Sequence, residues 1–127
     1  MNYIAGSLLY HADDVIAFEL LCRLLNDYHL KEVHMHNLTG FYIHTKTLDK
    51  LLDREEPKIA AHFKKHNVQL VSITPAWVIC LFSQNMPITC IQRFFSMFWA
   101  DDWVAFYKLV LLIFKDMEDS ILEKNSI

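Results

Sequence analysis

Two histidines, His62 and His66, stand one helical turn apart, a spacing that can bring two imidazoles to a single metal ion. The glutamate that accompanies such a pair in metalloproteases is missing from their surroundings. The neighbouring Lys58 and Lys65 are typical of a helix face in contact with water. We therefore interpret this pair as part of a solvated surface and predict no metal site.

Cys80 is the strongest candidate for a nucleophile, because a histidine and an aspartate could complete a triad with it. It lies in an apolar segment without a positive neighbour that would lower the pKa of its thiol, so we expect it to be inert. His34 and His36 flank Met35 in a predicted loop, and we interpret both as surface residues. A phosphate-binding glycine loop is also missing. The sequence predicts no catalytic residue, no cofactor and no bound nucleotide.

Adjacent carboxylates occur twice, at Asp13-Asp14 and at Asp101-Asp102. Two catalytic carboxylates must reach one substrate, but residues next to each other in sequence diverge on a helix surface. Both pairs precede apolar helical segments, and Asp is a favoured residue at the start of a helix. We therefore predict that both pairs cap helices.

The composition excludes several classes of protein. The 127 residues are 54% hydrophobic and include only two glycines, which favours one helical domain over disorder or a many-stranded sandwich. The net charge of -3 provides no basic field for nucleic acid. The most apolar segment, residues 103–114, is shorter than the roughly 20 residues that span a bilayer. Cys22, Cys80 and Cys90 are widely separated, which predicts reduced thiols in the cytosol.

The first forty residues predict two helices and a loop. Residues 1–10 are apolar but have no opening cap, as if the chain had been cut at its front. The helix after Asp13-Asp14 is expected to be central, and residues 29–40 are expected to form a connecting loop. The apolar stripe of this helix consists of Val15, Phe18, Leu21, Cys22, Leu25 and Tyr28, widened by Ile16, Leu20 and Leu24.

The remaining residues predict further helices and an all-α fold. An amphipathic pattern covers residues 41–53, with Phe41 and Leu48 facing inward. The expected architecture is an irregular multi-helix domain over residues 1–123, followed by a tail at 124–127. Other helix starts are indicated by Glu55-Glu56-Pro57, by Thr74-Pro75 for residues 76–83, by Met86-Pro87, and by Asp101-Asp102 for a last helix that reaches Leu122.

Aromatic residues gather between positions 94 and 107. Their helical spacing assigns most of them to the core, although an exposed aromatic patch is typical of a recognition surface. Trp99 and Trp103 flank the Asp101-Asp102 turn, so we predict that these two residues take part in binding a partner.

The order of these segments resembles a TBC domain over nearly the whole chain. The resemblance begins with Met1-Asn2-Tyr3-Ile4-Ala5-Gly6 and an apolar helix, and it covers the C-terminal part of that domain. The residues that carry it further are Ala17-Phe18, Leu21-Cys22-Arg23-Leu24-Leu25, Asp27-Tyr28, Leu48-Asp49-Lys50-Leu51-Leu52, Pro57, His62, Trp77, Leu81-Phe82, Pro87, Arg93 and the helix from Phe106 to Leu112.

The resemblance implies an activator of Rab-type small GTPases rather than an enzyme with its own substrate. TBC proteins insert an arginine, which neutralises charge on the transferred phosphoryl group, and a glutamine, which orients the attacking water. Both motifs belong to the N-terminal half of the domain, and the glutamine motif runs directly into the Met-Asn that matches Met1-Asn2. Arg23, Arg54 and Arg93 do not occupy the family's arginine setting. The chain alone is therefore expected to be catalytically incompetent.

The expected partner is a Rab GTPase, and Asn2 joins Trp99 and Trp103 as a predicted partner-binding residue. The open first helix further predicts that another protein chain covers an apolar face at the N-terminal end. Participation in vesicle traffic implies a location in the cytoplasm, at the periphery of endomembranes. The alternative is a non-catalytic interaction or scaffold module derived from a TBC domain, because neither catalytic finger is present in the chain.

Overall fold

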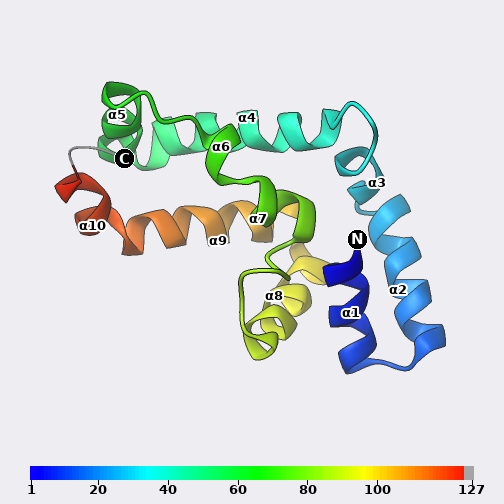
Figure 1. The fold of residues 1–127 in the computed structure, drawn as a ribbon. Coiled ribbons are helices and arrows are strands. Elements are labelled where there is room, and N and C mark those ends of the chain that lie inside the picture. The colour runs from blue at the N-terminus through cyan, green and yellow to red at the C-terminus, as the bar shows by residue number, and fades with distance from the viewer. Residues whose placement is uncertain (125–127) are drawn as a thin grey trace.

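The computed structural model describes residues 1–124, which fold into ten helices without a strand (Figure 1). The all-α prediction is therefore confirmed. Residues 125–127 of the predicted tail lie outside the described residues. The helices are α1 (Asn2–His11), α2 (Asp14–Asn26), α3 (Leu30–Val33), α4 (Thr39–Glu55), α5 (Pro57–Lys65), α6 (Leu70–Ile73), α7 (Pro75–Cys80), α8 (Ile88–Asp101), α9 (Trp103–Asp116) and α10 (Glu118–Glu123).

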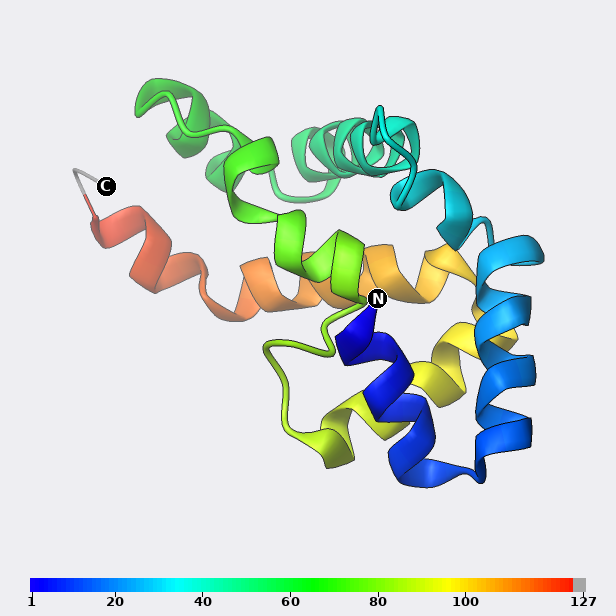
Figure 2. The same cartoon turned by 45° about the vertical axis from the view of Figure 1, so that its right-hand side comes forward.

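The long helices α4 and α9 run side by side and form the centre of the fold (Figures 1 and 2). The short helices α6 and α7 pack on α4, while α5 and α10 meet at the far end of the pair. At the other end, α1 and α2 form a helical hairpin, and α1 also contacts α8. None of the helices within residues 1–124 combines the length and apolar character required to cross a membrane.

Several helix starts follow the sequence signals. The Asp13 carboxylate accepts a hydrogen bond from the Ile16 amide at 2.9 Å, which caps α2 as predicted. Helix α1 begins at Asn2 without a side-chain cap. Pro57 occupies the first turn of α5, where its missing amide proton costs no hydrogen bond.

The predicted cap of α9 is wrong. Asp101 is the last residue of α8, and the side chain of Asp102 makes no capping hydrogen bond. Asp102 has φ 58° and ψ -147°, whereas a capping residue usually has backbone angles in the β region. Thr74 likewise precedes α7 without capping it, because its hydroxyl donates to the Leu70 carbonyl at 2.8 Å.

Some boundaries also differ from the prediction. The expected loop at 29–40 contains α3 and the start of α4, because Leu30 and Val33 are fully buried and hold one turn of helix against the core. Helix α7 ends at Cys80 because Leu81 and Phe82 adopt positive φ angles of 47° and 62°. The last helix is divided into α9 and α10 around Met117.

Phe94, Phe95, Phe98, Trp103 and Phe106 are buried, which confirms the prediction that most of the aromatic residues between 94 and 107 are internal. Phe82 contacts Phe94 and Phe106, with ring centroids 5.4 Å and 5.3 Å apart. Phe98 packs edge-on against Trp103 at 5.5 Å. These contacts join α8 and α9 to the turn that follows α7. They stabilise this packing because each ring buries a large apolar area.

Helix α2 is peripheral, so its predicted central position is wrong. It packs mainly against α1 and α3 at the edge of the molecule (Figure 2). Ala17 and Leu24 are its buried residues, whereas Val15 is 73% exposed and Phe18 is 69% exposed. Val15 and Phe18 of the predicted stripe are therefore exposed, while Leu24, one of the residues that widened it, is fully buried. The helix carries more apolar surface than α1 and α3 cover.

Candidate partner-binding surfaces

The candidate metal and nucleophile positions lie apart in the fold. His62 lies on α5 and His66 directly follows that helix, with their ring centroids 4.4 Å apart. Within residues 1–124, no three or more His, Cys, Asp and Glu side chains gather as a metal site would require. Cys80 is buried at the end of α7, where its sulfur lies 3.8 Å from Gln84 Oε1. The two histidines and Cys80 therefore do not form a shared reaction centre.

His34 departs from its predicted place on the surface. It is half-buried at the end of α3, and its Nε2 atom is buried without a hydrogen-bond partner among the described residues. Burial lowers the pKa of His34, and the positive charge of the chain's N-terminus lowers it further. Its imidazole is consequently favoured in the neutral form.

Trp103 and Trp99 are joined by Tyr28. The Trp103 indole N–H donates to the Tyr28 carbonyl at 2.7 Å, and the Tyr28 hydroxyl donates to the Trp99 carbonyl at 2.8 Å. Trp103 is only 7% exposed, so its side chain belongs to the core. Trp99 is half-buried, and Asn2 is exposed at the start of α1. The role of these three residues in partner binding stays a prediction.

His44 forms a polar contact between α4 and α9 that the sequence did not single out. Its Nδ1 atom lies 2.6 Å from the Tyr107 hydroxyl, and its ring stacks on Trp103. Burial lowers the pKa of His44 to about 4, with a further lowering from the charge of His29, while burial raises the pKa of Tyr107. The sequence could have indicated that His44 faces inward, because it lies three residues after Phe41 and four before Leu48, and both of these residues are buried.

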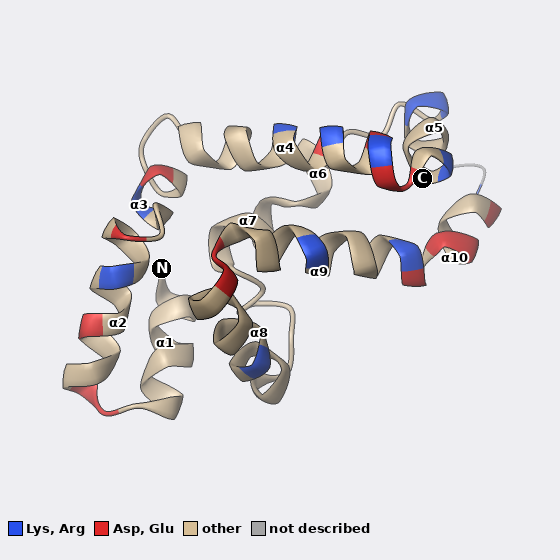
Figure 3. Ribbon diagram, turned by 180° about the vertical axis from the view of Figure 1, so that it is seen from behind, with Lys and Arg blue, Asp and Glu red and all other residues tan. Residues whose placement is uncertain are grey.

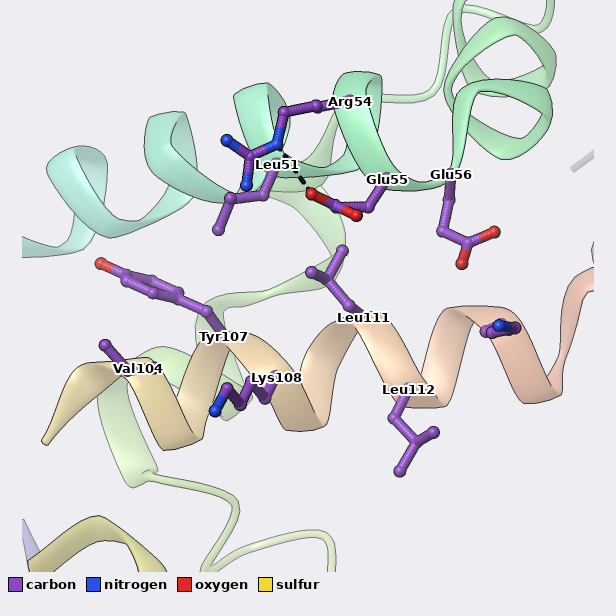
Figure 4. A pocket seen from close by; sticks show the side chains of 10 residues that line it. Leu51, Arg54, Glu55, Glu56, Val104, Tyr107, Lys108, Leu111 and Leu112 are labelled. Carbon is purple, nitrogen blue, oxygen red and sulfur yellow. Dashed lines mark hydrogen bonds and ion pairs between the residues drawn. The ribbon is translucent and has the colours of Figure 1, made fainter. Parts of the chain in front are cut away.

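A groove of about 510 Å³ lies between α4 and α9, and we call it the α4–α9 groove (Figure 4). Leu51 and Leu111 point toward each other across it, and Tyr107 extends its apolar surface. Its lining residues are Leu51, Arg54, Glu55, Glu56, Val104, Tyr107, Lys108, Leu111, Leu112 and Lys115. A concave surface with an apolar floor and charged walls is suited to binding rather than to proton transfer.

A second hollow lies between α1 and α2 and has a volume of about 240 Å³. We call it the α1–α2 hollow; it is lined by Ala5, Leu9, Asp14, Ala17, Phe18 and Leu21. Leu9 is 54% exposed, and the neighbouring Tyr10, Val15 and Ile16 are exposed as well. Adjacent exposed apolar residues around a hollow are typical of a surface that another polypeptide covers.

Comparison with known proteins gives a consistent result. The family model described as Rab-GTPase-TBC domain matches residues 1–122. The GTPase activating protein Gyp51 of Schizosaccharomyces pombe is 25% identical over 98% of this chain and 12% of its own length. Growth hormone-regulated TBC protein 1 of Xenopus tropicalis is 27% identical, with 99% of this chain matched to 37% of that protein. TBC1 domain family member 2A of Mus musculus is also 27% identical, over 97% of this chain and 13% of its own length.

Proposed function

The chain belongs to the Rab-GTPase-TBC domain family, and from this premise we propose that it is the C-terminal part of a domain that activates Rab-type small GTPases. The proposed part extends over residues 1–123. It supports and completes the domain, whereas the arginine and the glutamine that act on the nucleotide come from another part. The observation that carries this proposal is the match over residues 1–122 together with the uncovered apolar hollow between α1 and α2.

The arginines of this chain support the proposal that it does not catalyse GTP hydrolysis alone. An arginine finger must be available to reach the phosphates of a bound GTPase. Arg23 is engaged with Glu19 at 3.0 Å, and Arg54 with Glu55 at 2.7 Å. Arg93 is exposed on α8, and no ion pair involves it among residues 1–124. The three lie on α2, α4 and α8, and two of them are already paired with a carboxylate of their own helix.

The α1–α2 hollow supports the proposal that a further polypeptide packs here. Leu9 and Phe18 line the hollow from opposite helices and remain largely exposed. Full burial of one such side chain contributes about 1.5–3 kcal/mol, so a partner surface that fills the hollow would gain substantial binding energy. In the proposed parent domain, the half with the catalytic fingers is this partner.

The proposed site of action is the cytoplasmic surface of endomembranes, because Rab GTPases direct membrane traffic. The nucleotide and its metal ion would be held by the GTPase, and the TBC part would supply no cofactor of its own. Asn2 and Trp99 remain proposed contacts to the GTPase or to the catalytic half, because both offer accessible surface.

A chimera tests this proposal. The part of the Xenopus tropicalis relative's TBC domain that precedes its matched segment is joined to residue 1, and GTP hydrolysis is measured with a panel of Rab proteins. The matched control is the same chimera with the supplied arginine and glutamine replaced by alanine. We expect the intact chimera to accelerate hydrolysis and the control to fold without doing so. A folded chimera that binds none of the Rab proteins would contradict the activator function.

The alternative function is a non-catalytic interaction module. One observation favours it: an exposed apolar surface such as the α1–α2 hollow calls for a partner but not for catalysis. The same chimera separates the two functions. A chimera that binds a Rab protein at the same affinity as its alanine control, but leaves hydrolysis unchanged, would favour the interaction module.

A further inference from the structure

The α4–α9 groove combines an apolar floor with partly exposed apolar walls. Leu51, Tyr107 and Leu111 are half-buried along the floor, while Leu112 on the α9 side is 62% exposed. The lining residues of α9 extend from Val104 to Lys115, which corresponds to roughly 16 Å along the helix axis. This length accommodates about three turns of a second helix.

The charges of the groove are distributed unequally between its walls. On α4, the Arg54 guanidinium bonds the Glu55 carboxylate at 2.7 Å, so these two charges compensate each other (Figure 4). On α9, Lys108 and Lys115 are exposed, and neither takes part in an ion pair among the described residues. Figure 3 shows two separate basic bands along α9, and the basic residues of that helix are Lys108 and Lys115. Glu56, at the end of α4, also lines the groove and forms no ion pair among the described residues. The groove is therefore lined by three basic and two acidic side chains, and its small excess of positive charge lies on α9.

We propose that the α4–α9 groove binds an amphipathic helix of a partner protein, with acidic side chains about seven residues apart facing Lys108 and Lys115. Apolar side chains of the partner at positions i, i+3, i+4 and i+7 pack on Leu51 and Leu111. The spacing follows from the structure, because Lys108 and Lys115 stand two turns apart on one side of α9. This surface is distinct from the α1–α2 hollow, and the inference does not depend on the activator function.

Helical packing explains the choice of occupant. Two helices that run side by side leave a furrow, and the ridge of a third helix fits such a furrow. A peptide that binds by adding a strand to a sheet would require an open sheet edge, and residues 1–124 contain no strand. An anionic membrane could contact Lys108 and Lys115, but a flat surface would leave the apolar floor of the groove unfilled.

The experiment uses the whole chain and a synthetic peptide of about 14 residues that carries the apolar pattern and two glutamates seven positions apart. Binding is measured by fluorescence anisotropy at low salt. The double variant Lys108→Glu and Lys115→Glu should bind the peptide about tenfold more weakly. A peptide with lysines in place of the two glutamates should instead bind the double variant more tightly than the parent chain. Adding Leu112→Ser, a change at an exposed position, should weaken binding of the acidic peptide to the parent chain. It should likewise weaken binding of the lysine peptide to the double variant.

Lys58 and Lys65 supply the matched control, because they are exposed on α5 with the same spacing but do not line the groove. The variant Lys58→Glu and Lys65→Glu should bind the acidic peptide as the parent chain does, and circular dichroism confirms that each variant is helical. The inference is overturned if the parent chain does not bind the peptide, or if the groove and control variants bind it equally. Lysine-dependent binding to phosphatidylserine vesicles without peptide binding would also overturn it. The Rab assay of the chimera is independent of each of these outcomes.

Discussion

The imidazole of His44 lies almost parallel to the indole of Trp103, with ring centroids 3.6 Å apart and an interplanar angle of 20°. The same imidazole reaches the Tyr107 hydroxyl at 2.6 Å. These contacts connect the second turn of α4 to the first two turns of α9. The two helices that form the walls of the α4–α9 groove are therefore held together by a neutral histidine.

The first prediction concerns the dependence of stability on pH. The pKa of His44 is lowered from 6.5 to about 4 in the folded chain, mainly by burial. Between these values the unfolded chain binds the proton more strongly, so the free energy of unfolding should fall as the pH drops from 6.5 toward 4. Urea unfolding of the parent and of His44→Gln across this range measures the effect. The difference between the two should be largest at pH 7 and shrink toward pH 4, and a constant difference would contradict the assignment.

The second prediction compares the two tryptophans joined by Tyr28. Trp103→Ala should cost roughly 3–5 kcal/mol, because it removes a buried indole and leaves the Tyr28 carbonyl without its donor. Trp99→Ala should cost less, because Trp99 is only half-buried: the variant loses the edge-on contact of its ring with Tyr28 but keeps the backbone carbonyl that accepts from the Tyr28 hydroxyl. Thermal unfolding of both variants tests this order, and equal losses would be inconsistent with it.

The third prediction uses the two glycines as a pair. A Cβ atom at Gly40 would lie 2.7 Å from the Glu32 carbonyl carbon and from the Val33 nitrogen, both backbone atoms. Gly40→Ala should therefore destabilise the chain by several kcal/mol, since α3 and α4 would have to separate. Gly6 has open space around it within α1, so Gly6→Ala should stabilise by about 0.5–1 kcal/mol. Chemical denaturation of both variants should give shifts of opposite sign.

The fourth prediction concerns self-association through the α1–α2 hollow. Leu9→Ser combined with Phe18→Ser removes two largely exposed apolar side chains. Sedimentation should show less association than in the parent chain, with only a small change in thermal stability. Ile43→Ser provides the control, because Ile43 is 57% exposed on α4 and lines neither the hollow nor the α4–α9 groove. An equal effect of that control would argue against a specific role for the hollow.

The sequence predicted where helices begin better than it predicted which of their residues are buried. The starts of α2, α5 and α8 followed from Asp13, Pro57 and Pro87, because capping and proline effects depend on a few neighbouring residues. The exposure of Val15 and Phe18 could not be predicted in this way, since the apolar surface of α2 extends beyond one face. Which part is covered depends on α1 and α3, and therefore on tertiary packing.

The candidate surfaces were predicted only in part. An open apolar face at the N-terminal end was expected, and the exposure of Leu9 and Phe18 agrees with it. The α4–α9 groove was not expected, because it depends on how two helices about fifty residues apart in sequence pack together. The buried position of Trp103 has the same origin: the carbonyl that receives its indole proton belongs to Tyr28.

The most direct test of the central claim is the rate of GTP hydrolysis by a panel of Rab proteins in single turnover, with and without the purified 127-residue chain. If the chain is the supporting part of a TBC domain, the rates should be unchanged, and they should rise only when the half with the arginine and glutamine fingers is joined to it. Acceleration by the chain alone would contradict this account.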